Sequence, residues 1–155
     1  MEQETLLTDV EFQPVIASVG KRFLNYLIDV ITFYVLCFLL GILFAQQVYE
    51  MRTINSESDF TLKIELIAVL VLLFYYCICE IVFKGRTIGK FITGTKAVNE
   101  DGTPIDANKA LLRTLSRVVP FEPFSVFGGR PWHDKWTNTY VIDIRKTTGN
   151  NINLQ

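Results

Sequence analysis

The sequence has little of what most enzyme active sites are built from. Its 155 residues contain one histidine, His133, and no glycine spacing typical of a phosphate-binding loop. Asp134 follows His133 directly, and adjacency in sequence does not by itself orient a general base. Histidine and cysteine spacings typical of metal ligands are also lacking. We therefore expect a protein that is not an enzyme and that uses no cofactor and no metal.

Cysteine is scarce, and its positions argue against a disulfide. Cys37, Cys77 and Cys79 all lie inside long apolar runs. Around a helix Cys77 and Cys79 diverge by ~200°, which disfavours shared ligation. We interpret the three as small, reduced residues of membrane helices.

A strong excess of either charge is lacking too, because 15 Lys and Arg balance 16 Asp and Glu. The signs are nevertheless segregated along the chain. The amino-terminal arm is acidic, through Glu2, Glu4, Asp9 and Glu11. The later half is basic, through Lys84, Arg86, Lys90, Lys96, Lys109, Arg113 and Arg117. This pattern is typical of a protein at a membrane edge, and we expect no nucleic-acid partner.

What the sequence has in abundance is apolar residues, at 50% of the chain. They concentrate in two runs of roughly 20 residues, each long enough at ~1.5 Å per residue to cross a hydrocarbon core of about 30 Å. The first run follows an acidic arm and is too long for a cleaved signal peptide, so we expect it to stay in the mature protein. The sequence predicts an all-α membrane core with two transmembrane helices, at about 23–44 and 64–83.

The first predicted helix carries a polar stripe. Arg22, Asn25 and Asp29 recur at helical spacing, because positions seven apart differ by only ~20° around a helix. A carboxylate inside hydrocarbon is costly unless it has a partner. Asp29 must therefore face protein, water or a cation, or be protonated.

The positive charges around the two runs predict the orientation. The loop 46–63 has only Arg52 and Lys63, whereas Lys21, Arg22, Lys84, Arg86, Lys90 and Lys96 flank the other ends. By the positive-inside rule, the loop lies outside and both termini are cytoplasmic in the cell (inner) membrane. Residues 1–14 are then an acidic cytoplasmic arm, and 146–155 a flexible tail.

Glu80 lies about one turn from the inner end of the second run, at a depth similar to that of Asp29. In one interpretation it reaches the interface or pairs with Lys84 at i+4. In the other, it forms a shared acidic site with Asp29.

Beyond the second run the pattern becomes mixed. Asp101-Gly102, between short β-prone runs at 95–99 and 103–105, predicts a β-hairpin. Asp106 is a suitable N-cap for an amphipathic helix at the cytoplasmic surface, where it binds anionic lipid. Its basic face holds Lys109, Arg113 and Arg117, opposite Leu111, Leu115 and Val118. The apolar character through 127 is too brief for a full span, although a re-entrant segment or a third span remains an alternative.

The carboxy-terminal part predicts a short helix and a strand. Trp132 and Trp136 are four residues apart, a spacing that suits packing at the headgroup level. Alternation over 140–145 predicts a strand that adds to the hairpin.

These residues together resemble the RDD family, a group of mostly bacterial membrane proteins named for one arginine and two aspartates. The resemblance covers about residues 15–145. It is carried by Lys21-Arg22 and Asp29, Thr87-Ile88-Gly89-Lys90, the Asp-Gly turn, Arg113, and His133-Asp134-Lys135 followed by Thr139 and Val141. The stretch 119–124 departs from family members that have a longer third hydrophobic segment.

The resemblance implies that Arg22, Asp29 and Asp134 are the family's named residues. With Glu80 they form a candidate ion site; Asn25, Gly89, Lys90, Arg113, His133 and Thr139 are structural motif positions. We expect a carboxylate partner for Arg22, either Asp29 or Asp134. Alternatively, Asp134 caps the tail or locks it against the membrane helices.

Two functions are consistent with these features. The first is a transporter or transporter subunit for an ion or small ligand, with Asp29 and Glu80 as its site. Two helices cannot enclose an aqueous path, so this function requires a homo-oligomer or a partner membrane protein. The second is a non-transporting membrane adaptor that binds anionic lipid or a partner protein, with the polar stripe fixing helix packing.

Overall fold

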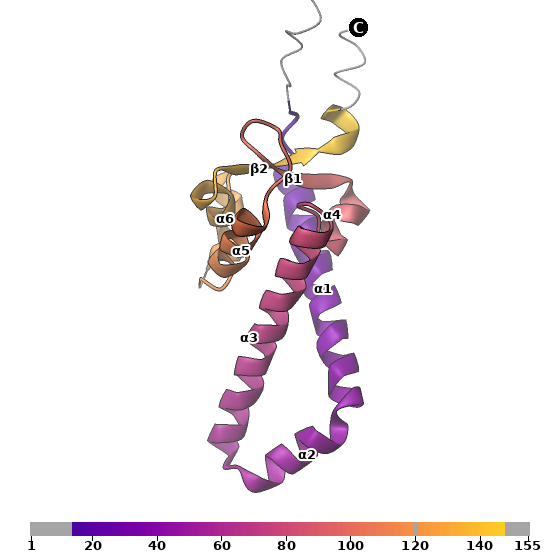
Figure 1. Ribbon diagram of the computed structural model, residues 1–155, viewed down its shortest axis with the longest axis vertical. Helices are drawn as coiled ribbons and strands as arrows, with labels where there is room; N and C mark the ends of the chain where they lie inside the picture. The colour runs from indigo at the N-terminus through magenta and orange to yellow at the C-terminus, as the bar shows by residue number, and fades with distance from the viewer. Residues whose placement is uncertain (1–13, 120, 148–155) are drawn as a thin grey trace, which may run out of the picture.

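The structure is a computed structural model that describes residues 14–119 and 121–147. Two long helices, α1 (Val19–Leu43) and α3 (Glu57–Val82), form an antiparallel hairpin joined through α2 (Ala45–Ile54). The remaining elements gather at the end of the hairpin opposite α2 (Figure 1). These residues, 84–147, are referred to below as the head. The protein is thus a helical hairpin with a compact head at one end.

The long helices begin at side-chain caps. The Ser18 hydroxyl accepts from the Lys21 N–H at the start of α1, and the Ser56 hydroxyl accepts from the Asp59 N–H at the start of α3. Both helices start earlier than the predicted spans, and α2 makes most of the expected loop 46–63 helical. The two helices pack together near the head and diverge toward α2 (Figure 1). An apolar cavity of about 510 Å³ lies between their diverging ends, with Leu40 and Ile67 in its wall.

Near the head, α1 buries polar residues and exposes apolar ones. Only 6% of the most apolar window of α1 is buried, and 22% of that of α3. The residues that α1 does bury are Arg22, Asn25 and Asp29, the predicted polar stripe. A soluble core helix would bury its apolar side instead. Both helices are long and apolar enough to cross a membrane, and their exposed apolar surface fits lipid.

The described residues contain no third helix of this kind. The chain leaves α5 (Ala107–Ser116) and continues into a short 3-10 helix, η2 (Glu122–Gly128). Neither is long enough to cross a bilayer, so the alternative of a third span is wrong.

The sheet of the head pairs residues distant in sequence. Strand β1 (Thr95–Asn99) runs antiparallel to β2 (Thr139–Asp143), with Ala97 opposite Val141. The predicted β-hairpin is reduced to a tight turn: Gly102 N–H donates to the Asn99 carbonyl, and a single bridge joins Val98 to Pro104. The prediction of a strand over 140–145 that joins this unit is confirmed, and β1 is its partner in the described two-stranded sheet.

The amino-terminal segment covers the other edge of β2. Ala17 N–H donates to the Val141 carbonyl at 2.9 Å, and Asp143 N–H donates to the Val15 carbonyl at 2.8 Å. Thr147, which we expected in a flexible tail, is buried, and its hydroxyl accepts from the Val15 N–H at 3.1 Å. The described ends of the chain therefore meet at β2. Most of the expected arm and tail, at 1–13 and 148–155, lies outside the described residues.

Helix α5 begins where predicted, with the Asp106 carboxylate accepting from the Lys109 N–H at 2.9 Å. Its basic face is only partly at the surface, however. Arg113 is completely buried, whereas Leu111 and Leu115 are exposed. The expected basic surface is wrong at Arg113, because buried carboxylates of the hairpin and of α6 (Trp132–Trp136) require its charge. The predicted short helix at 132–136 is confirmed.

Candidate functional site

The buried polar residues of the hairpin meet the head in one network. Asp29 is buried on α1 and accepts three hydrogen bonds. They come from the Tyr75 hydroxyl at 2.8 Å, the Thr87 hydroxyl at 2.7 Å and the Gly89 N–H at 2.8 Å. An ionised carboxylate can only accept, so three donors suit it. We expected Asp29 to face protein, water or a cation, or to be protonated; the structure shows that it contacts protein.

The loop into α4 (Ile88–Thr93) brings two of these donors to Asp29. Thr87 is the N-cap of α4, and its hydroxyl also accepts from the Lys90 N–H. Gly89 permits the close approach: a Cβ built there would lie 2.4 Å from the Asn25 carbonyl oxygen and 3.0 Å from an Asp29 oxygen. Any larger residue must push α4 away from α1.

Asn25, the middle residue of the stripe, binds the next segment of the head. Its amide lies 2.9 Å from the Thr95 hydroxyl and also contacts the Thr93 hydroxyl. The stripe therefore docks α1 against α4 and the start of β1.

Glu80 on α3 has no exposed surface and contacts three cations. Its carboxylate lies 2.8 Å from Lys90 Nζ, 2.9 Å from Arg113 Nε and 3.1 Å from Arg117 Nη2. Both interpretations from sequence, an interfacial or Lys84-paired Glu80 and a site shared with Asp29, are wrong. The chain reverses after α3, where Lys84 has a φ of 48°, and this turn delivers Lys90 to Glu80 instead.

Arg113 joins α3 to the end of the chain. Besides Glu80, it contacts Asp134 at 2.6 Å and the Thr139 hydroxyl. Burial alone would lower the pKa of Arg113, but the Glu80 and Asp134 carboxylates outweigh it and the pKa is raised. Asp134 thus holds α6 and β2 against the hairpin, the arrangement expected if it locks the tail.

Arg22 differs from the other basic residues of the network. It donates to the Gly129 carbonyl, and no described carboxylate oxygen lies within 4.0 Å of its side-chain nitrogens. The expected pairing with Asp29 or Asp134 is therefore wrong. Asp29 is occupied by three donors, and Asp134 bonds Arg113 through Oδ1, while its Oδ2 has no partner among the described residues and lies beyond contact with Arg22.

Sequence reasoning missed the pair of His133 and Glu122, in which His133 Nδ1 contacts a Glu122 oxygen. Burial, followed by nearby cations such as Arg117, lowers the pKa of His133 well below its usual value. Burial also raises the pKa of Glu122. A carboxylate between two prolines gave no pattern from which this pairing could be predicted. Within the described residues, no three His, Cys, Asp or Glu side chains are placed to hold a metal.

Comparison with protein families supports the resemblance noted in the sequence. The model of the RDD family matches residues 16–142, and the chain belongs to this family. Comparison with curated proteins and with solved structures gave no significant match. The matched range contains the hairpin and the head up to β2. The chain is therefore an RDD family, membrane-associated protein with two long apolar helices.

Gly89→Ala tests the close approach of α4 to α1. The added methyl group would meet the Asn25 carbonyl, so we expect a loss of about 2 kcal/mol or more in detergent, measured by thermal unfolding. Gly41→Ala is the matched control, because a Cβ at Gly41 meets nothing within 4 Å. Equal stability of the two variants would contradict this packing.

Glu80→Gln tests the charge network. Removing the carboxylate leaves Lys90 and Arg117 buried without it, and we expect a loss of about 3–5 kcal/mol in unfolding free energy. Hydrogen exchange should increase in α4 and α5 more than in α2. Glu65→Gln, at an exposed position of the same helix, should change neither measurement. A Glu80→Gln protein as stable as this control would show that the network contributes nothing to stability.

Proposed function

We propose that the protein is a non-transporting membrane scaffold, in which the hairpin anchors the head and fixes its orientation. The observation that carries this proposal is the engagement of the hairpin's buried side chains by the head. Asp29, Asn25 and Glu80 are each bound by residues beyond position 84. Polar groups inside membranes that satisfy one another specify how helices pack.

The occupancy of both carboxylates argues against a transport site. A transported cation would need free oxygens, but Asp29 already accepts from three neutral donors and Glu80 contacts three cations. Opening either cluster would strand buried charges, at a cost of several kcal/mol. Binding and release of an ion would have to overcome this cost in every cycle.

The far half of the hairpin supports the same conclusion. The cavity between the diverging ends of α1 and α3 is lined by apolar residues apart from Gln47 and Cys37. No described charged side chain lines it, whereas transport sites are usually polar and lie near the middle of the membrane.

We place the head on the cytoplasmic side of the cell membrane and α2 on the outer side. The support is the concentration of basic residues such as Lys21, Lys84 and Arg86 at the head. The exposed leucines of α5, Leu111 and Leu115, give this side an apolar surface for the bilayer, a partner membrane protein or a second copy of the chain.

Flux into sealed vesicles containing only this protein tests the scaffold role. We expect Na⁺ and proton flux equal to that of protein-free vesicles. The measurement is made at about pH 6 and about pH 8, on either side of neutral pH. Asp29→Asn should remain folded and lose about 1 kcal/mol, because an amide oxygen can keep two donors while its NH₂ faces the Thr87 hydroxyl.

Pronounced wild-type flux that Asp29→Asn abolishes, in a folded protein, would overturn the scaffold role in favour of transport. Asp59→Asn is the control, because this carboxylate is exposed at the other end of the hairpin.

Cysteine labelling of whole cells tests the orientation. In a chain whose three native cysteines are replaced, Ser58→Cys should react with an impermeant maleimide and Asp101→Cys should not. Both positions are exposed, so a cysteine at either one can react with the maleimide. Thr147, near the end of the described residues, is buried and would be a poor labelling position. Asp101→Cys should react after permeabilisation. Labelling of both positions in intact cells would contradict the topology.

A further inference from the structure

Two cavities adjoin where α1 and α3 meet the head. The first has a volume of about 50 Å³ and lies among α1, α4, the end of α5 and α6. The second, of about 220 Å³, runs along α1 and α3. They share Tyr26, Arg117 and Glu122 in their walls, so they lie next to each other.

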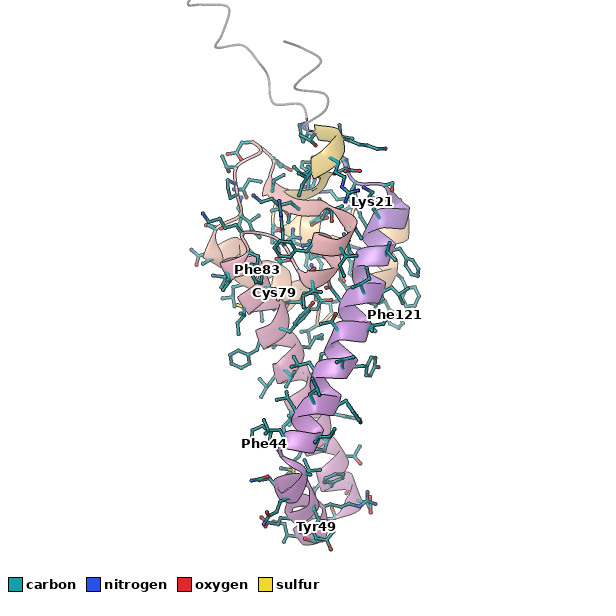
Figure 2. The ribbon with its side chains drawn as sticks, turned by 90° about the vertical axis from the view of Figure 1, so that its right-hand side faces the viewer. Lys21, Phe44, Tyr49, Cys79, Phe83 and Phe121 are labelled. Carbon is teal, nitrogen blue, oxygen red and sulfur yellow. The ribbon has the colours of Figure 1, made fainter. Side chains whose placement is uncertain are left out.

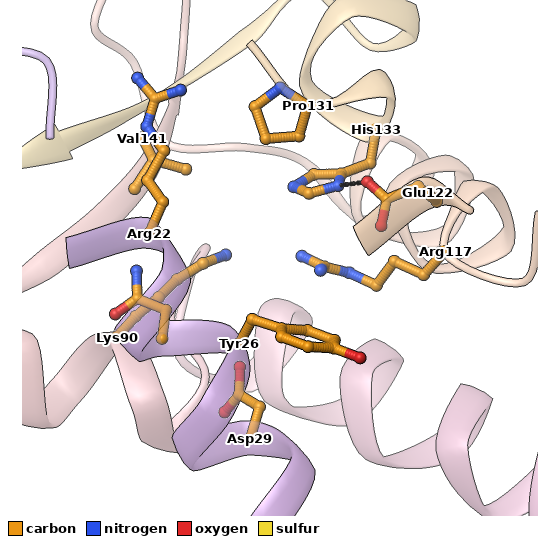
Figure 3. A pocket seen from close by; sticks show the side chains of 10 residues that line it. Arg22, Tyr26, Asp29, Lys90, Arg117, Glu122, Pro131, His133 and Val141 are labelled. Carbon is orange, nitrogen blue, oxygen red and sulfur yellow. Dashed lines mark hydrogen bonds and ion pairs between the residues drawn. The ribbon is translucent and has the colours of Figure 1, made fainter. Parts of the chain in front are cut away.

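The first cavity is rich in basic groups. Arg22, Lys90 and Arg117 line it, and Lys90 and Arg117 reach toward its middle from opposite sides (Figure 3). Its two carboxylates are already engaged, Asp29 by three donors and Glu122 by His133. Lys90 and Arg117 both contact Glu80, so Arg22 is the cation in this wall that has no described carboxylate partner.

Two buried donors in this wall have no acceptor. Arg22 Nε and Arg117 Nε make no hydrogen bond to any described residue. Arg22 is also the cation of the network that lacks a described carboxylate. Buried polar groups are nearly always bonded, so unpaired guanidinium N–H groups indicate a missing acceptor. A group with several anionic oxygens would supply it.

The second cavity has a different character. Val30, Phe33 and Leu72 form much of its wall, and it leads along the helices away from the head. Near it, Phe121 and Phe124 are 75% and 68% exposed at the start of η2. Phe121 lies beside α1 at the height of Cys79, along the hairpin rather than above it (Figure 2). The site therefore opens where these aromatic side chains would meet lipid.

We propose that the two cavities together hold one anionic phospholipid. Its phosphate lies against Lys90, Arg117 and Arg22, and one acyl chain lies along Val30, Phe33 and Leu72. The first cavity has room for roughly four water-sized positions, comparable to the oxygens of one phosphate group. Inorganic phosphate would fill only the first cavity and leave the apolar one empty. This site is independent of the scaffold role, because either a scaffold or a transporter could contain it.

Lipid titration of the delipidated full-length protein in detergent tests the site. Native mass spectrometry and the rise in unfolding temperature report binding of phosphatidylglycerol, of phosphatidylcholine with the same chains, and of inorganic phosphate. We expect one phosphatidylglycerol per chain, bound about tenfold more tightly than phosphatidylcholine, and weak binding of inorganic phosphate.

Variants separate the two parts of the site. Arg22→Gln should weaken phosphatidylglycerol about tenfold and remove the preference over phosphatidylcholine. Leu72→Trp fills the apolar cavity and should weaken both lipids, whereas Leu70→Trp, at an exposed position of the same helix, should weaken neither. Unfolding temperatures measured without lipid identify any variant that fails to fold. If Arg22→Gln does not fold, the comparison of Leu72→Trp with Leu70→Trp still tests whether lipid binds in the apolar cavity.

Three results would overturn the proposal. The first is equal affinity of wild type for the two lipids, and the second is equal lipid binding by Leu72→Trp and Leu70→Trp. The third is inorganic phosphate binding as tightly as phosphatidylglycerol, which would define an anion site without a lipid.

Discussion

The contact between Glu80 and its three cations is the interaction on which the position of the head depends. A carboxylate with no exposed surface loses its hydration, and only nearby positive charge offsets that loss. Lys90 and Arg113 come from separate segments of the head, so satisfying Glu80 positions both at once. Arg113 then extends the network to Asp134 and to the end of the chain. Because the buried Glu80 carboxylate requires positively charged partners, it determines how the segments of the head are placed.

Asp29 meets the same constraint by different means. Its donors are two hydroxyls and a backbone N–H, and no described cation lies within ion-pair distance. Neutral donors need correct geometry more than they need charge, which explains why Gly89 and the N-cap Thr87 lie there. The hairpin thus uses one carboxylate to gather charge and the other to fix the distance between α1 and α4.

The local features could be predicted from the sequence, and the long-range partners could not. The apolar runs, the polar stripe and the Asp106 cap depend on spacing alone, and the structure contains all three. The prediction for α5 was wrong at Arg113 because the amphipathic pattern was taken to place all of its basic residues outward. Arg113 points inward because Glu80 and Asp134 are buried. These partners are distant from it in sequence, so a local pattern could not predict the contact. The mistaken partner of Arg22 has the same origin, since the fold turns Asp29 toward Tyr75, Thr87 and Gly89 and turns Asp134 toward Arg113.

The position of β2 between the first described residues and β1 has a consequence for synthesis. Val15 and Ala17 emerge from the ribosome long before the strand that bonds them, because the two helices and most of the head lie between them in sequence. Asp134, one partner of Arg113, also arrives late. A partly synthesised chain can place its hairpin in the membrane while the strand edges and several charges still await partners. The head therefore closes only after β2 has been made, and until then its unpaired strand edges and exposed apolar surface favour aggregation.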